Sequence, residues 1–351
     1  MTAPADLAGG FIRTLLQMYQ DAEILMLAKV SNRLAKGLDN PSWAEEKLLQ
    51  TIAVRRELEE VLSELKDATP AQVQEALELA YSRGQRLALA DGKELGLEMS
   101  WFATPPSAMM QLVDQTSFLL LATHGRILRQ TEDAYRSVIQ MAAAEVVQGT
   151  TTRVEAAQHA LNGLLGRGIT GFTDSAGRNW DLASYTEMAT RSGAMNALVQ
   201  GHVQELSDNG FDLVIVSEHT RECEICRPWE GKVLSVTGAT SGYLTLDQAR
   251  MEGLFHPNCK HRTGIYVKGV TPLPTDTEDP EGAAAQERQR EIERKIREWK
   301  RREALALEEQ AAAQAAAKVR DWQAAMRAHL EANPDLTRLY GREAIGDTRA
   351  R

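Results

Sequence analysis

Cysteine is scarce in this chain of 351 residues, which contains only three. So small and odd a number argues against a disulfide framework. Residues 1–10 lack the basic and apolar regions of a secretory signal peptide. We therefore expect a protein made in a reducing cytosol, in which the cysteines have a purpose other than disulfide pairing.

Long apolar runs and aromatic residues are also lacking. No stretch of about eighteen apolar residues occurs, which argues against a membrane-spanning helix and a membrane partner. Aromatic residues make up 5% of the chain, whereas Ala, Leu, Glu, Gln and Arg are abundant, and this mixture favours helix over sheet. The net charge of −9 argues against a surface built as a whole to bind nucleic acid. The predicted fold class is α+β, mainly α.

Residues 1–165 carry the signals of a helical domain. Ser42 and Glu45 have the spacing of a capping box, and Pro70 after Thr69 predicts the first turn of another helix. Four leucines and valines between positions 58 and 65 form an amphipathic stripe. A long helical pattern covers about 107–149. No residue in this half indicates catalysis, and the isolated His124 and His159 are assigned no role.

The pattern changes in residues 166–270. Asp174 and Gly177 predict the turn of a β-hairpin, and a helix is expected from about 184 to 209, ended by Gly210. Short β-branched runs at 211–216, 233–236 and 264–267 suit buried strands. We therefore predict a small α+β module here.

The remaining residues, 271–351, are predicted to be a linker and a charged helical tail. Prolines mark the linker at 272–280, and one helix is expected from 281 to about 333, before Pro334. Between Arg288 and Arg302 lie eight Lys or Arg and three Glu. Such a run is most often a solvated helix face, although a coiled-coil arm or a contact with DNA is an alternative.

All three cysteines fall within one short segment. Cys223 and Cys226 are separated by two residues, a spacing that presents both thiolates to one metal, and Cys259 follows about thirty residues later. The fourth ligand is open. His256 lies three residues before Cys259 at a comfortable chelating distance, and His261 lies two residues after it, on the same side of an extended segment.

The predicted site is structural. Three thiolates and one imidazole form a closed zinc site, whereas catalytic zinc keeps an open position. His219, four residues before Cys223, is a weaker candidate and fits a loop histidine better. The alternative, that these are unrelated residues of a reduced protein, is disfavoured because all the cysteines and three of the seven histidines cluster here. We expect about one Zn²⁺ per chain.

Several motifs together resemble a known family. They are the runs 174–180, 185–188, 191–192, 228–232 and 255–261 with the Cys-x-x-Cys pair. The sequence resembles the phage minor capsid protein 2 family, which is similar in its zinc-type module to Mu F-like head morphogenesis proteins. The family pattern often ends in Cys-x-Cys or Cys-x-His, which favours His261. Ser192 stands where the family commonly has threonine.

The resemblance implies a virion component of a tailed phage, made in the bacterial cytoplasm and located in the head interior or at the portal vertex. The implied partners are the portal protein and capsid or scaffold proteins, with packaged DNA as a further candidate through Arg288–Arg302. The resemblance supplies no active site, so we expect no enzyme. The alternative is a zinc-stapled enzyme, either a His-Asn-His nuclease or a toxin-like effector. Its candidate residues overlap the presumed structural ligands.

Overall fold

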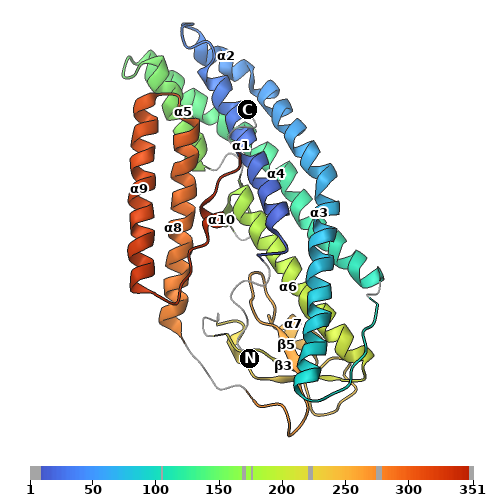
Figure 1. Cartoon of the computed structure of the whole chain (residues 1–351). Coiled ribbons are helices and arrows are strands. Elements are labelled where there is room, and N and C mark those ends of the chain that lie inside the picture. Colours follow the sequence, from blue (N-terminus) through green and yellow to red (C-terminus); the bar gives the residue numbers. More distant parts are fainter. Residues whose placement is uncertain are drawn as a thin grey trace. The chain divides into compact units, whose positions relative to one another are not determined.

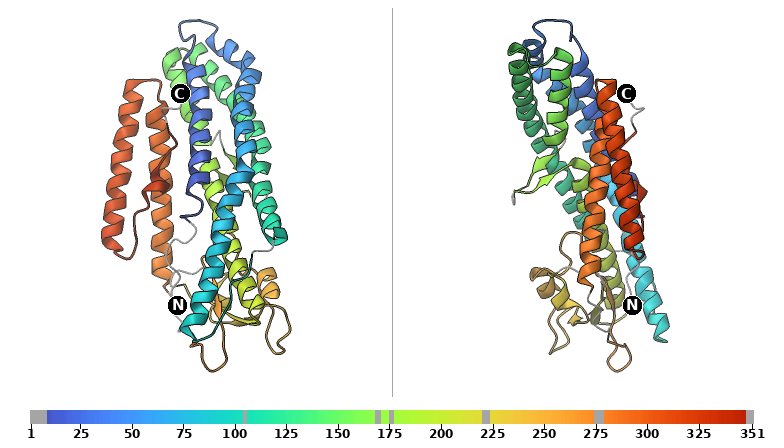
Figure 2. Two further views of the ribbon diagram at one scale, coloured as in Figure 1. Left: turned by 45° about the vertical axis from the view of Figure 1, so that its right-hand side comes forward. Right: turned by 90° about the vertical axis from the view of Figure 1, so that its left-hand side faces the viewer.

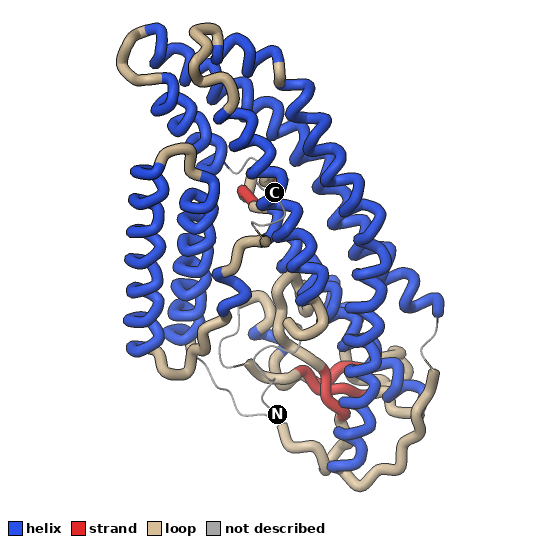
Figure 3. Tube along the Cα trace, turned by 45° about the horizontal axis from the view of Figure 1, so that its top comes forward, coloured by secondary structure: helices blue, strands red, loops and turns tan. Residues whose placement is uncertain are grey.

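A computed structural model describes residues 9–103, 106–167, 171–174, 177–219, 224–273 and 279–347. Long helices dominate it and the strands are few and short (Figure 3), so the predicted α+β, mainly α class is confirmed. Among the described helices, none is both long and apolar enough to cross a membrane.

The chain divides into two compact units, each made of three segments. Unit 1 comprises residues 1–15, 69–119 and 187–284, and unit 2 comprises 16–68, 120–186 and 285–351. Both units therefore draw on the two halves of the chain. The division into domains at 165 and 270 stays a prediction.

Unit 2 is a helical bundle. It contains most of α1 (Arg13–Ala35), α2 (Trp43–Leu49), the first part of α3 (Thr51–Glu94), most of α4 (Pro106–Val147) and α5 (Arg153–Arg167) (Figure 1). The predicted stripe of α3 is confirmed, because Leu58, Val61, Leu62 and Leu65 are all buried. Burial of this stripe is what fixes the helix in the bundle.

The predicted capping box before α2 is wrong. Ser42 is the N-cap residue, but its side chain makes no capping hydrogen bond. Hydrogen bonds from Asn40 hold the chain at this helix start instead. Its side-chain oxygen accepts a hydrogen bond from the Ser42 amide at 2.9 Å, and its side-chain amide donates to Glu46. A short asparagine side chain two residues earlier thus satisfies the helix start.

The sequence predicted that Pro70 begins a helix. It lies instead inside α3. A proline there cannot donate the backbone hydrogen bond that the helix needs and crowds the preceding turn. Burial on both sides opposes this cost, since Thr69 is fully buried and Val73 and Leu77 are 1% exposed. Side-chain packing therefore holds Pro70 within one continuous helix, where the local signal predicted the start of a new one.

The charged tail is two helices rather than the single helix predicted. The chain turns between α8 (Pro280–Leu305) and α9 (Glu309–Ala332), which lie side by side in both views of Figure 2. Ile292 and Ile296 of α8 pack with Met326 of α9 in a small buried cluster. Because this apolar seam joins the two helices, the tail folds back on itself. A short helix, α10 (Tyr340–Glu343), follows.

The predicted hairpin in unit 2 is confirmed. β1 (Phe172–Thr173) pairs antiparallel with β2 (Asn179–Trp180). Asp174 accepts hydrogen bonds from the Arg178 amide and from the Trp180 indole, both at 2.9 Å. The predicted turn residues 175 and 176, and residues 168–170 before the hairpin, lie outside the described residues.

Unit 1 contains residues 187–270 of the predicted middle module, whereas residues 166–186 with the hairpin belong to unit 2. The helix α6 (Leu182–Asp208) enters the unit at residue 187 and ends before Gly210, which has φ +83°. A three-stranded antiparallel sheet follows in the order β4–β3–β5, with β3 (Leu213–Val216) in the centre. β4 is Val233–Ser235 and β5 is Thr263–Ile265. α7 (Leu246–Met251) begins with a capping box from Thr245 and Gln248, which the sequence analysis missed.

Two glycines let α3 and α6 approach closely in unit 1. A Cβ atom on Gly84 would lie 2.0 Å from the Leu198 carbonyl oxygen, and one on Gly201 would lie 2.2 Å from the Tyr81 carbonyl oxygen. Neither clash can be relieved by a side-chain rotation, because both involve backbone. The two helices therefore depend on glycine at their crossing.

Candidate metal centre

Cys226 is held at the edge of the sheet module by a short turn. It is the N-cap residue of the 3₁₀ helix η1 (Arg227–Trp229), and its carbonyl accepts a hydrogen bond from the Trp229 amide at 2.9 Å. Its side chain is fully buried among residues of the module's core. The turn therefore points the Cys226 thiol inward.

Cys259 is presented by a strained loop just before β5. Phe255 and Asn258 have φ values of +61° and +67°, and the His256 carbonyl accepts the Cys259 amide at 2.9 Å. A positive φ is uncommon for a non-glycine residue and costs free energy that surrounding contacts must offset. One such contact comes from Ser192 of α6, whose hydroxyl accepts a hydrogen bond from the Asn258 amide at 3.0 Å.

The two thiols meet in the core. The Cys226 and Cys259 sulfur atoms lie 3.5 Å apart, far longer than the roughly 2.05 Å of a disulfide. Two sulfurs bound to one tetrahedral zinc ion are about 3.8 Å apart, given Zn–S bonds of about 2.3 Å. The pair is therefore free thiols at a separation that suits a shared metal ion.

His256 completes a group of three possible ligands. Its ring and the two sulfurs each offer a ligand atom, and these atoms lie within 4.8 Å of one another. The Nδ1 atom of His256 donates to the Pro257 carbonyl at 2.8 Å, since a carbonyl can only accept. Its Nε2 is then the unprotonated nitrogen, which is the form that binds a metal.

His261 approaches the same sulfurs from the segment just before β5. Its Nδ1 lies 3.3 Å from the Cys259 sulfur. Its Nε2 donates to the carboxylate of Glu230, so that Nδ1 is the unprotonated atom. A carboxylate behind a ligating histidine is a common arrangement around zinc. Both candidate histidines thus stand beside the thiols.

A backbone amide and the neighbouring side chains set the electrostatic surroundings of the two thiols. The His261 amide donates to the Cys259 sulfur at 3.4 Å. The adjacent Cys259 thiol and burial together raise the pKa of Cys226. Burial lowers the pKa of His261, but hydrogen bonds to Cys226 and Glu230 outweigh burial and raise it. A bound cation would reverse this balance by stabilising the thiolate.

The predicted ligands are therefore placed as follows. The structure brings Cys226, Cys259, His256 and His261 together, whereas Cys223 lies outside the described residues. The choice of ligand set stays a prediction. His219 lies nearby, with its ring centroid 6.2 Å from that of His261 and its amide donating to Glu230 at 3.1 Å. Its amide thus helps to hold the carboxylate.

The sequence analysis missed the residues that support the site. Glu230 was noted only as part of a family motif, although the pattern of a carboxylate near a Cys-x-x-Cys turn could have marked it. Ser192 was noted as a departure from threonine, and its hydroxyl turns out to hold the Cys259 loop. A threonine hydroxyl can do the same, which explains why the exchange is compatible with the fold.

A second polar cluster missed from the sequence joins α3, α6 and β5. The Nε2 atom of His202 donates to Asp91 at 3.1 Å, and the Thr263 hydroxyl donates to its Nδ1 at 2.9 Å. Arg262 lies 3.8 Å from the same carboxylate. All four residues are buried, so the cluster ties elements of unit 1 together rather than meeting a substrate.

Comparison with known proteins identifies the family. A sequence profile described as phage minor capsid protein 2 matches residues 4–331. The chain belongs to the phage minor capsid protein 2 family.

A relative of this minor capsid protein is known from another phage. A "Structural protein" of Lactococcus phage LL-H is 27% identical over 226 residues, covering 60% of this chain and 61% of that protein. The match thus spans less than two thirds of the relative. No solved structure matches the chain. The predicted family is confirmed, and the family marks the chain as a structural component of a phage.

Proposed function

We propose that this minor capsid protein is a non-enzymatic part of the phage head, placed at the portal, with a structural zinc ion in its sheet module. One observation carries the zinc proposal: two buried thiols lie 3.5 Å apart with two histidines beside them. Reduced cysteines in an ordinary core have no need of converging imidazoles and a carboxylate.

The donor set supports zinc over harder cations. Sulfur and imidazole are the ligands that zinc prefers, whereas Mg²⁺ and Ca²⁺ prefer oxygen. Four protein ligands drawn from Cys223, Cys226, Cys259 and one histidine would close the coordination shell. Such a site supplies folding free energy, and the module has a short sheet and a small core that gain from it.

The position of the ligands supports a role in assembly. Cys226 and Cys259 lie in loops at either end of the segment that carries β4 and α7, so one ion would fix the path of the segment between them. A fixed segment offers a defined surface to a partner. On the basis of the family and of the structural relative, we propose the portal protein and capsid proteins as its partners.

Co-assembly with the portal protein tests this function. Purified chain is mixed with assembled portal rings and separated by sedimentation, with portal alone and chain alone as references. We expect a constant ratio of chain to ring in the fast fraction. A chain that stays in the slow fraction while cleaving DNA with added Mg²⁺ would contradict the proposal and favour the nuclease alternative.

A further inference from the structure

Most of the positive charge between Arg288 and Arg302 is used inside unit 2. Its cations bind carboxylates, carbonyls and a hydroxyl of the same unit: Arg288 with Glu291, Lys295 and Arg302 with Glu298, Arg297 with Ser184 and the Arg342 carbonyl, Lys300 with the Glu343 carbonyl, and Arg301 with Glu23. Arg290 also has a partner. Arg294 differs, because its exposed side chain makes no hydrogen bond or ion pair with a described residue.

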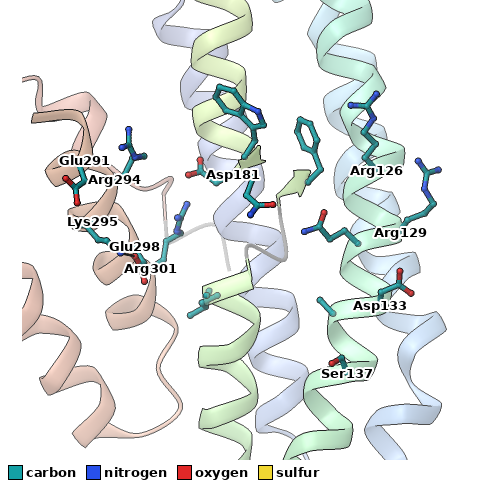
Figure 4. Close-up of a pocket in the computed structure, with 17 residues that line it drawn as sticks. Arg126, Arg129, Asp133, Ser137, Asp181, Glu291, Arg294, Lys295, Glu298 and Arg301 are labelled. Atoms are coloured by element: carbon teal, nitrogen blue, oxygen red, sulfur yellow. Dashed lines mark hydrogen bonds and ion pairs between the residues drawn. The ribbon is translucent and has the colours of Figure 1, made fainter. Parts of the chain in front are cut away.

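Arg294 borders a cleft of about 1140 Å³ in unit 2. Figure 4 shows α8 on one side of this cleft and α4 on the other, with the β-hairpin between them. Arg126 and Arg129 of α4 line the opposite wall, three residues apart and therefore on one helix face. Both are exposed and, like Arg294, make no ion pair or hydrogen bond with any described residue. The Arg126 guanidinium lies over the Phe172 ring, 5.7 Å from its centroid. Three arginines from two helices thus share one cleft.

Three of the four carboxylates that line the cleft interact with cations of α8. Asp181 accepts hydrogen bonds from the Ser184 amide at 2.7 Å and its hydroxyl at 3.0 Å. Arg297 lies 3.8 Å from it, and the charges of Arg297 and Arg301 outweigh burial and lower its pKa. Glu291 pairs with Arg288 and also interacts with the charge of Arg294, and Glu298 pairs with Lys295. In the described part of the lining, Asp133 is the one carboxylate without an ion pair, so the uncompensated charge is positive.

The chemistry of the cleft suits phosphate groups. The planar guanidinium of arginine presents paired donors that match phosphate oxygens. Trp180 adds an aromatic wall, and its indole is oriented by the hydrogen bond to Asp174. The cleft is slightly larger than a typical small-molecule pocket, which spans about 300–1,000 Å³. A polymer segment with regularly spaced anions fits better than a single small anion.

We propose that Arg126, Arg129 and Arg294 bind the phosphodiester backbone of a nucleic acid along this cleft. The proposed DNA contact therefore uses only one residue of the Arg288–Arg302 run, together with two residues of α4. The net charge of −9 opposes the approach of a polyanion. Binding should therefore be moderate in strength and steep in its dependence on salt.

Fluorescence anisotropy with a labelled 20-base-pair duplex and a labelled 20-nucleotide strand tests the proposal. The triple variant Arg126→Ala, Arg129→Ala, Arg294→Ala is compared with the control Arg56→Ala, Arg320→Ala, Arg327→Ala. The control removes the same charge from exposed arginines outside the cleft. We expect the slope of log Kd against log salt to fall by about 2 to 3 in the cleft variant and to change little in the control.

Several results would overturn the proposal. They are absence of binding by the wild-type chain, equal losses in the cleft and control variants, or stronger binding of a labelled polyglutamate peptide than of either nucleic acid. The two nucleic-acid probes distinguish duplex from single strand as the ligand. The metal content and thermal unfolding of each variant are measured alongside. A loss of nucleic-acid binding with both unchanged separates this proposal from the zinc and portal proposals.

Discussion

Glu230 and His261 form a buried hydrogen-bonded pair beside the cysteines, with the carboxylate accepting from the Nε2 of the imidazole. This pairing leaves the Nδ1 atom of His261 unprotonated, within hydrogen-bond distance (3.3 Å) of the Cys259 sulfur. The carboxylate therefore decides which nitrogen of the ring can bind a metal. It also holds the ring in place, since both side chains are largely buried.

Removing the carboxylate should weaken metal binding while leaving the thiols intact. In the Glu230→Ala variant, His261 loses the group that fixes its tautomer and orientation. Losses of about 10- to 100-fold in metal affinity are typical when such a supporting residue is removed. Competition against a chromophoric chelator measures the change. The exposed Glu252→Ala serves as the control, and equal affinity in the two variants would show that Glu230 has no role in the site.

The buried cluster around Asp91 should be a major source of stability in unit 1. An Asp91→Ala variant leaves the His202 ring nitrogen buried without its acceptor and removes the carboxylate that lies 3.8 Å from the Arg262 guanidinium. Breaking a buried pair of this kind costs about 3 kcal/mol or more. Urea unfolding followed by circular dichroism measures the loss. Asp67→Asn, on an exposed position of the same helix, should stay within about 0.5 kcal/mol of wild type; a comparable loss there would contradict the account.

His124 should make the stability of unit 2 sensitive to acid. Burial, with a smaller effect from Lys66, lowers its pKa from 6.5 to about 4, and the Tyr19 hydroxyl lies 3.4 Å from its Nε2. The folded state therefore binds the proton less readily than the unfolded state. Stability from neutral His124 is complete above pH 6.5 and is lost as the pH falls towards 4.

The His124→Gln variant should remove this part of the acid sensitivity. Between pH 7.5 and pH 4.5, the free energy of unfolding of wild type should fall by about 2 kcal/mol more than that of the variant. His159→Gln is the control, because His159 is exposed beside Glu145. Parallel pH profiles for wild type and His124→Gln would refute the assignment.

Local signals in the sequence identified much of the fold. The apolar stripe of α3, the β-hairpin, the end of α6 at Gly210 and the three strands of the module all follow from spacing and turn chemistry. Such signals failed where tertiary packing opposes them. Pro70 has the signal of a helix start but is held within α3 by its buried neighbours. The tail turns back on itself because Ile292 and Ile296 pack against Met326.

The candidate site was predictable only in its ligands. Cysteine and histidine are rare and their spacing is chemically restrictive, so Cys226, Cys259 and the two histidines stood out. The supporting contacts join residues that are far apart in the chain, such as Ser192 with Asn258 and Asp91 with His202. Serine, aspartate and glutamate are common, and no local pattern distinguishes the few that meet in space.

The zinc content of the purified chain tests the central claim most directly. Elemental analysis after gel filtration in metal-free buffer should give about one zinc per chain for wild type and about none for Cys226→Ala. Hydrogen exchange of that variant should show lost protection first within residues 166–270. A wild-type chain that carries no metal, and whose thermal unfolding is the same with and without a chelator, would contradict the account.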